Sequence, residues 1–260
     1  TTGNFIFRTR EFEMMEIEYF VKPQDNEKYY KEWINNSMEF ILSLNIDKSN
    51  LRLREHDPED LSHYSKGTTD IEYKFPWGWA ELQGIANRGS FDLDSHSKAS
   101  SKNFSIFEEA TKTRYTPYVI EPSIGVDRLL LITLLDAYKE EKIENKSETR
   151  TVLKISPKIS PIKIAILPLS KDQKLSELSK KIQKDLLSKG DLGKIEYDET
   201  QSIGRRYRRQ DEIGTPLCIT IDFDSLEDNG VTIRNRDSML QERVNLDSLH
   251  ETLKKTIKDY

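Results

Sequence analysis

Apolar and polar residues alternate along the first half of the chain in runs that predict β-strands. These runs are Phe5–Phe20, Leu51–Asp57, Asp70–Phe75 and Trp79–Ala86. Between the first two runs, Asn26–Leu44 carries apolar residues three and four positions apart, which predicts an amphipathic helix. The residues of its apolar stripe are Tyr30, Trp33, Ile34, Met38, Ile41 and Leu42.

A broken strand and a buried helix come next. The run "YTPYVIEPS" (115–123) is extended and interrupted by prolines, and "IGVDRLLLITLLDAYKEE" (124–141) predicts a strongly apolar helix. The charged stretch Lys139–Arg150 and the proline-containing Ser156–Pro161 then predict a link, with a domain boundary after residue 155. After it, strands and helices alternate up to a closing helix from Leu246. We therefore predict an α+β chain whose second domain is a compact α/β unit.

The first run carries its charge mainly on one face, because side chains of equal parity share a face of a strand. One face would hold Arg8, Arg10, Phe12, Met14, Glu16 and Glu18. The other would hold Phe5, Phe7, Met15, Ile17 and Tyr19 and pack on a core. The charged face is either the solvated side of an antiparallel sheet or a floor for a charged ligand. Spacing alone favours the solvated side.

Composition narrows the function classes. Apolar residues make up 35% and charged residues 33% of the 260, and the net charge is −5. Nothing therefore attracts the chain as a whole to nucleic acid, and an RNA contact needs a local patch. The single cysteine, Cys218, excludes an internal disulfide and a cysteine-based zinc site, and its apolar surroundings predict a core residue.

Several common sites are absent from the sequence. The histidines at 56, 63, 96 and 250 lack zinc-ligand spacing, and there is no glycine-rich phosphate loop and no nucleophile elbow. No apolar run reaches membrane length and no signal peptide is visible, so we expect a cytoplasmic protein. The chain starts "TTGNF", without methionine, and we expect it to be a piece of a longer protein.

Two further segments place charge in apolar surroundings. In "WGWAELQGIANRG", Trp79, Glu81, Gln83 and Ile85 would share a face, with Arg88 at the strand end. The carboxylate of Glu81 is compatible with a structural ion pair and equally with a metal ion. In "YVIEPSIGVDRLLL", a glutamate, a serine and an arginine bracket the start of the apolar helix. Capping explains the first two, whereas the arginine suggests a binding role. These three residues are Glu121, Ser123 and Arg128.

Four arginines surround Tyr207 in "GRRYRRQDE". On a helix, three of them lie near one face, which predicts an RNA-binding patch. The alternative is that Asp211 and Glu212 pair with them. The four arginines are Arg205, Arg206, Arg208 and Arg209.

Several longer segments of the sequence resemble the motifs of a known family. "FRTREFEMMEIEYF" resembles the second half of motif 2 of class II aminoacyl-tRNA synthetases, and "EPSIGVDR" resembles their motif 3. These segments, with "WGWAELQGIANR" and "IGRRYRRQDEIGTP", are similar to dimeric glycyl-tRNA synthetases, in order and over nearly the whole chain. The resemblance implies a partial class II catalytic domain with an antiparallel sheet over residues 1–155. Residues 156–260 would be an anticodon-binding domain with a mixed sheet.

The resemblance also implies site residues on the charged face. The ATP site would comprise Phe7, Arg8, Thr9, Arg10, Glu11, Phe12, Glu81, Leu82, Arg88, Gly125, Val126, Asp127 and Arg128. Arg8 and Arg128 would be catalytic, and Glu81 would hold Mg²⁺. The glycine pocket would comprise Phe12, Glu13, Met14, Met15, Glu16, Glu121 and Ser123. The tRNA contacts would be Arg205, Arg206, Arg208 and Arg209.

By this resemblance the protein activates glycine with ATP and transfers it to tRNA(Gly), as a homodimer with no membrane association. Motif 1 and the Arg-Asn-Glu start of motif 2 are absent, so we expect the 260-residue chain alone to be inactive. A non-catalytic, synthetase-like accessory subunit of a DNA polymerase is the alternative, and another class II specificity is a third. The presence of the acidic and basic ligand residues favours the ligase.

Overall fold

The computed structural model describes residues 1–57, 59, 66–143 and 148–260. The chain forms two compact units, Thr1–Thr133 and Leu134–Tyr260, and the division falls within α3 (Val126–Ala137). His63 lies outside the described residues, as does part of the predicted link, 144–147.

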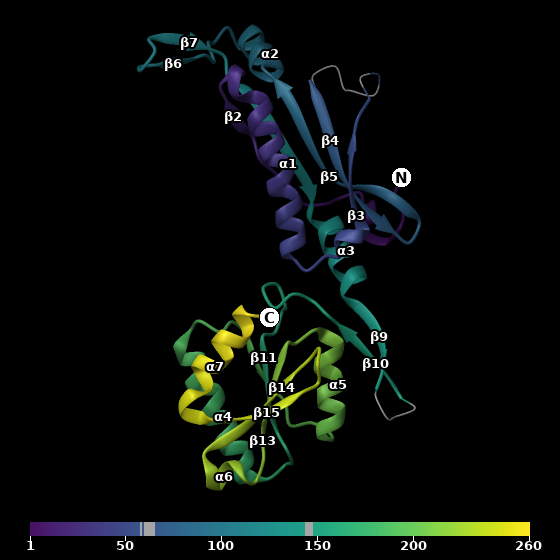
Figure 1. The fold of residues 1–260 in the computed structure, drawn as a ribbon, viewed down its shortest axis with the longest axis vertical. Helices are drawn as coiled ribbons and strands as arrows, with labels where there is room; N and C mark the ends of the chain where they lie inside the picture. The colour runs from purple at the N-terminus through teal and green to yellow at the C-terminus, as the bar shows by residue number, and fades with distance from the viewer. Residues whose placement is uncertain (58, 60–65, 144–147) are drawn as a thin grey trace. The chain divides into compact units, whose positions relative to one another are not determined.

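An antiparallel sheet forms the first unit (Figure 1). Its strands run in the order β1, β8, β5, β4, β3, and β2 also pairs with β8. The bounds are β1 (Met14–Glu16), β2 (Tyr19–Val21), β3 (Leu51–Glu55), β4 (Gly67–Phe75), β5 (Gly78–Gly89) and β8 (Tyr118–Gly125). The antiparallel sheet with helices agrees with the predicted fold class.

One long helix, α1 (Asn26–Ser43), covers a single face of this sheet, as Figure 1 shows. Ser37 of α1 accepts a hydrogen bond from Gln83 Nε2 on β5 at 3.2 Å, and Ile71 and Ile85 beneath the helix are fully buried. Short 3₁₀ turns, η2 (Pro23–Asp25) and η3 (Lys48–Asn50), flank it. The predicted amphipathic helix is confirmed, and the opposite face of the sheet carries the polar side chains described below.

A β-bulge in β5 makes one of our predicted faces wrong. Ile71 pairs with Gln83, but the next residue of β4, Glu72, pairs with Glu81, so Leu82 is an extra residue. An extra residue reverses which face the following side chains occupy. Glu81 therefore lies on the face opposite to Gln83 and Ile85, which are buried.

The run Phe5–Phe20 is not one strand, which corrects a second prediction. Asn4 and Phe5 have φ angles of 53° and 55°, and a 3₁₀ turn, η1 (Phe5–Phe7), follows. The predicted apolar face does not pack as a unit, since Phe5 is 79% and Ile17 43% exposed.

The edge of the sheet is interrupted between β1 and β2, at the point where Pro122 of β8 lies opposite Ile17. Both strands pair with β8 in a single register, in which Glu16 lies opposite Ser123 and Tyr19 opposite Ile120. Pro122 lies between these partners and has no N–H to donate across to Ile17. Ile17 still donates its own N–H to the Pro122 carbonyl at 3.0 Å, so the two short strands remain aligned.

Three elements of the first unit were not predicted. They are α2 (Phe91–Ser100), β6 (Ile106–Glu108) and β7 (Thr113–Tyr115). α2 has no buried residue and the two strands form a separate hairpin, so the apolar periodicity that reveals an element is weak there.

The predicted charged link is in fact a β-hairpin, which is a third correction. α3 ends at Ala137, earlier than predicted, and β9 (Tyr138–Lys142) then pairs with β10 (Thr149–Leu153). Arg150 lies opposite Glu141 and donates to its carboxylate at 2.6 Å. Charges that pair across strands stabilise a hairpin although their composition resembles that of a linker.

The second unit is an α/β fold with a five-stranded mixed sheet, which agrees with the predicted alternation (Figure 1). The strand order is β12, β11, β13, β14, β15, with β11 parallel to both neighbours and the last two strands antiparallel. The strands are β11 (Ile164–Pro168), β12 (Ile195–Tyr197), β13 (Leu217–Ile221), β14 (Gly230–Asn235) and β15 (Gln241–Asn245). The helices are α4 (Gln173–Lys189), α5 (Ile203–Ile213), α6 (Ser225–Asp228) and α7 (Leu246–Lys258).

Two apolar layers hold this sheet. Leu175 of α4 and Leu253 of α7 are fully buried with Ile164 and Ile219 on one face. Tyr207 of α5 packs with buried residues on the other, including Cys218, which confirms that the cysteine is a core residue. Among the described residues, no helix is both long and apolar enough to span a bilayer.

A buried ion network connects the β9–β10 hairpin to the α/β sheet. The carboxylate of Asp211 on α5 is 1% exposed and accepts from both terminal nitrogens of Arg234 at 2.8 and 3.0 Å. It also accepts from Arg150 at 3.1 Å, and Arg150 donates to the backbone carbonyl of Arg236 at 2.7 Å. Asp211 therefore pairs with two buried guanidinium groups, of which Arg150 also pairs with Glu141.

We expect Asp211→Asn to destabilise the second unit by about 3–5 kcal/mol, because the buried Arg234 would lose its counter-charge and the buried Arg150 would keep only Glu141. Urea unfolding followed by circular dichroism measures this loss. All three tryptophans lie in the first unit, so their fluorescence follows the unfolding of that unit and serves as the internal reference. They are Trp33, Trp77 and Trp79. Glu212→Gln, at the exposed neighbouring position, is the matched control. A loss below about 1 kcal/mol for Asp211→Asn would contradict this account.

Candidate functional site

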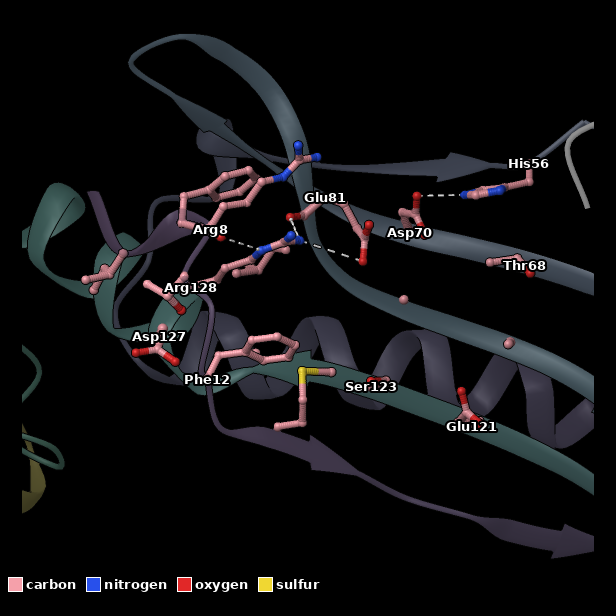
Figure 2. Close-up of a pocket in the computed structure, with 18 residues that line it drawn as sticks. Arg8, Phe12, His56, Thr68, Asp70, Glu81, Glu121, Ser123, Asp127 and Arg128 are labelled. Carbon is pink, nitrogen blue, oxygen red and sulfur yellow. Dashed lines mark hydrogen bonds and ion pairs between the residues drawn. The ribbon is translucent and has the colours of Figure 1, made fainter. Parts of the chain in front are cut away.

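A cavity of about 480 Å³ lies on the sheet face opposite α1 (Figure 2). It is bounded by the N-terminal segment, by β4, β5 and β8, and by the start of α3. Most of the residues predicted for the ligand face line it. These are Phe7, Arg8, Thr9, Phe12, Met14, Glu81, Leu82, Glu121, Ser123, Gly125, Asp127 and Arg128.

Two rows of side chains cross the sheet beneath the cavity. In the first row Asp70 pairs with Gly84, Gly84 with Ser123, and Ser123 with Glu16. Residues directly opposite each other in antiparallel strands point to the same face. Gly84 has no side chain and therefore leaves an open floor between Asp70 and Ser123.

The second row lies two residues along each strand. Thr68 pairs with Ala86, and Ala86 with Glu121. The register shared by β1 and β2 places Glu18 opposite Glu121. The two rows together give the cavity an acidic side, on β8 and the edge strands, and a small-residue floor.

Arg128 fixes the N-terminal segment over the sheet. Its guanidinium lies 4.3 Å from the centre of the Phe7 ring, and its Nε donates to the Phe7 carbonyl at 3.3 Å. Its Nη1 donates to the Glu81 carbonyl at 2.7 Å and lies 3.8 Å from the Glu81 carboxylate. Phe7 also packs edge-on against Phe75 and Trp77. The predicted arginine of the apolar helix thus faces the cavity.

The start of α3 also holds this segment. Val126 N–H donates to the Glu13 carbonyl at 2.9 Å, and Asp127 accepts from the Glu13 N–H at 3.3 Å. Phe12, 60% exposed, and the exposed Arg8 therefore stand at the mouth of the cavity, near Arg128. An exposed flat ring near two guanidinium groups suits a base with attached phosphates.

The acidic side of the cavity holds a partly paired cluster of carboxylates. Ser123 Oγ donates to Glu16 at 3.1 Å, and Arg88 Nη1 lies 3.0 Å from Glu121. Arg88 also donates to Asp92 at 2.6 Å. One arginine therefore serves two carboxylates, and the cluster keeps a net negative charge that favours a cationic ligand.

Glu18 lies opposite Glu121 at this side, so two carboxyl groups face each other. Burial, followed by the facing charge of Glu121, raises the pKa of Glu18 to about 7, while Arg88 acts in the opposite direction. The shift in pKa therefore has two main causes, which are partial loss of solvent around the carboxyl group and a like charge opposite it.

The structure does not bring every predicted residue to the cavity. Arg88 and Glu16 contact its lining through Glu121 and Ser123. The predicted residues outside the lining are Arg10, Glu11, Glu13, Met15, Glu16, Arg88 and Val126. The lining residues that sequence reasoning missed are Ile6, His56, Thr68, Asp70, Gly84 and Ala86. The alternation of polar residues in "TTDIEY" is the signal that could have identified Thr68 and Asp70.

The residues present offer few ligands for a metal ion. No group of three or more His, Cys, Asp or Glu side chains suited to a metal occurs in the part of the chain that the structure describes. Glu81 is the carboxylate near Arg128. A Mg²⁺ ion there would fit only if phosphate oxygens completed its coordination, which is the usual situation for this ion.

The structure separates the four arginines of α5. Arg206 is 1% exposed and donates to the Pro168 carbonyl at 2.5 Å, so it stabilises the fold and is inaccessible to RNA. Arg209 donates to Asp198 at 2.6 Å. Arg205 is exposed, and Arg208 is partly exposed and 4.0 Å from Asp211, one of the two acids considered as alternative partners.

We expect Glu18→Gln to stabilise the first unit at pH 8. Native Glu18 keeps its proton to about pH 7 whereas the unfolded side chain loses it near 4.5, so wild-type stability falls as pH rises between these values. Glutamine removes this loss of stability because it carries no charge at either pH. The gain in unfolding midpoint, followed by tryptophan fluorescence, should vanish below pH 4.5. Exposed Glu39→Gln on α1 is the control, and equal midpoints for Glu18→Gln and wild type at pH 8 would refute the repulsion.

Comparison with known proteins gives consistent results. Residues 163–256 match the family model of the anticodon binding domain. A glycine–tRNA ligase of Thermobifida fusca is 52% identical over 97% of the chain and 55% of its own length. That of Staphylococcus haemolyticus is 54% identical over 97% of the chain and 54% of its own length.

A glycine–tRNA ligase of Acetivibrio thermocellus is 55% identical over 96% of the chain and 53% of its own length. The chain therefore spans about half the length of the curated relatives it matches. A crystal structure of prolyl-tRNA synthetase from Cryptosporidium parvum, complexed with L-proline and AMP, superimposes with a TM-score of 0.71. It covers all of this chain and 53% of that one at 14% identity, which shows the shared fold alone. By sequence and fold, the chain belongs to the glycyl-tRNA synthetase family of class II aminoacyl-tRNA synthetases.

Proposed function

We propose that the full-length protein containing this chain is a glycine–tRNA ligase. It joins glycine to ATP to give glycyl-adenylate and pyrophosphate, and then transfers the glycyl group to the 3′ end of tRNA(Gly). The observation that carries this proposal is identity of 52–55% to glycine–tRNA ligases over nearly the whole chain. The cavity adds a physical reason, since one side suits a nucleotide and the other an ammonium group.

The nucleotide would lie on the Arg128 side. Phe12 would stack on adenine, and Arg8, Arg10 and Arg128 would contact the phosphates. The backbone of Gly125–Arg128 and the residues Phe7, Thr9, Glu11 and Leu82 would border it. Fixed guanidinium groups stabilise the charge that develops as the glycine carboxylate attacks the α-phosphate and pyrophosphate leaves. Such a reaction needs positioning more than a protein base.

Glycine would lie on the acidic side. Its ammonium would contact Glu16 and Glu121, with Ser123 between them and Arg88 holding Glu121 in place. Glu13, Met14 and Met15 belong to the same segment and would complete the pocket. Glycine has no side chain to recognise, so we attribute selection to exclusion of larger amino acids by a crowded pocket.

Mg²⁺ would be held by Glu81 together with ATP phosphate oxygens, and when bound it would neutralise phosphate charge. The ATP-binding set and the metal role are proposals drawn from the family resemblance and the geometry around Arg128.

We further propose that residues 1–155 are part of the catalytic domain and residues 156–260 an anticodon-binding domain. The anticodon-domain match over 163–256 supports the second assignment. The full-length protein would be a cytoplasmic homodimer. The relatives found favour the ligase over a non-catalytic accessory subunit, as do Glu121, Ser123 and Arg128 on one cavity with Glu16 beside Ser123.

The proposal predicts glycine-dependent exchange of labelled pyrophosphate into ATP by the full-length protein. Glu16→Gln should lower kcat/KM for glycine by about tenfold to a hundredfold, because one charge-assisted hydrogen bond contributes roughly 1.5–3 kcal/mol. The KM for ATP should change little, and Glu39→Gln should behave as wild type. No exchange with glycine would overturn the function, whereas normal exchange by Glu16→Gln would remove only Glu16 from the site.

We propose that Arg205 and Arg208, the accessible arginines of α5, contact tRNA. Arg205→Ala with Arg208→Ala should raise the KM for tRNA and reduce its dependence on salt, because phosphate contacts release counterions. Pyrophosphate exchange should survive. The matched control is Lys255→Ala with Lys258→Ala, which removes the same charge at the same spacing from exposed positions of α7. Equal effects of the two pairs would mean that only net charge matters.

A further inference from the structure

A histidine–aspartate pair on the cavity wall has no part in the activation step proposed above. His56 Nε2 lies 2.7 Å from Asp70 Oδ2, and both residues line the cavity (Figure 2). Asp70 is 6% exposed, and the His56 side chain is 25% exposed. A backbone hydrogen bond of 3.0 Å from His56 N to Thr68 O fixes the histidine beside β4.

The pair faces the acidic side of the cavity across an open floor. Asp70, Gly84 and Ser123 are paired neighbours on three adjacent strands, so Asp70 is about 10 Å from Ser123 at the usual strand spacing. A side chain at Gly84 would meet Asp70 Oδ1 at 3.7 Å. Asp70 Oδ1 therefore faces the floor over Gly84, which Glu81 Oε1 also borders at 4.0 Å from the same point, while Asp70 Oδ2 holds His56.

The width of this floor suits two reacting groups. An ammonium contacting Glu16 and Glu121 would lie about 3 Å from their oxygens. The carbonyl carbon of a glycyl group lies about 2.5 Å beyond its nitrogen. The open floor at Gly84 therefore leaves room for a hydroxyl oxygen between that carbon and the histidine–aspartate pair.

We propose that His56, held by Asp70, is the proton acceptor of the transfer step, an inference that rests on the proposed function. The hydrogen bond to Asp70 uses Nε2–H and leaves Nδ1 as the basic nitrogen. A ribose hydroxyl at the 3′ end of tRNA forms a new C–O bond to the glycyl carbonyl carbon and gives its proton to Nδ1. The bond from that carbon to the phosphate oxygen breaks, AMP leaves with the electron pair, and the proton passes to water.

The chemistry explains why the pair lies away from the nucleotide side. Activation uses a carboxylate that is already ionised, so it needs no base. Transfer uses a neutral hydroxyl, and general-base assistance contributes typically about 10²–10⁴-fold to such a step. Asp70 orients the ring and stabilises the imidazolium that forms.

The test separates the two half-reactions in the full-length protein. His56→Gln keeps a donor to Asp70 but has no base, so single-turnover transfer from enzyme-bound glycyl-adenylate should slow about 10²-fold. Glycine-dependent pyrophosphate exchange should stay within about threefold of wild type. His96→Gln, on α2 and outside the cavity lining, should leave both rates unchanged. If His56→Gln fails to fold, His56→Asn provides the same comparison.

Added imidazole should restore part of the transfer rate of the variant, because a lost base can be replaced in solution whereas a lost structural contact cannot. Transfer at the wild-type rate, or a parallel loss of exchange and transfer without imidazole rescue, would overturn the role of His56. Absence of glycine-dependent exchange in the wild-type protein would instead refute the proposed function. The two failures are therefore distinguishable.

Discussion

One extra residue in β5 decides which side chains face the cavity. Leu82 shifts the pairing between β4 and β5, so Glu81 faces outward while Gln83 stays beneath α1. Without the bulge, the Glu81 carboxylate would point toward the helix-covered face, where an unpaired charge is strongly destabilising. The bulge also presents the Glu81 carbonyl to Arg128, which in turn holds the N-terminal segment. The position of Glu81 and its contact with Arg128 therefore depend on this local irregularity.

Local periodicity predicted the helices and strands better than it predicted which face of a strand each side chain occupies. Asn26–Leu44 and the closing helix were recognisable because an amphipathic helix shows its buried stripe within a few turns. Glu81 was assigned to the wrong face because a bulge results from pairing with a strand that is distant in sequence. The break at Pro122 is likewise visible only once its partner strand is known.

The site was only partly predictable for the same reason. Glu16, Glu121 and Ser123 were proposed through resemblance to a family, and the register then placed them on neighbouring strands. His56 and Asp70 were missed, because two polar residues on neighbouring strands look like ordinary solvated positions until the floor at Gly84 is seen beside them. Sequence periodicity identifies a face but not what lies across it.

Arginine is used in opposite ways within a few residues of α5. Arg206 satisfies backbone carbonyls at the carboxyl end of β11, and Arg205 stays in solvent. A guanidinium has five donors on a long stem, so it can serve inside a fold as well as on a nucleic-acid surface. A run of arginines therefore specifies a helix with several donors, and burial then decides which of them remain accessible.

The missing N–H of Pro122 has a dynamic consequence for the edge of the sheet. It divides the edge into two short strands that can open separately. β2 is anchored to α1, because Tyr19 packs edge-on against Tyr29 and Trp33 at 5.5 and 5.4 Å. The residues of β1 are all exposed, and hydrogen bonds at Glu13 hold its outer end. The cavity wall formed by β1 can therefore open locally while β2 stays paired. Amide hydrogen exchange should be faster at Met15 than at Val21.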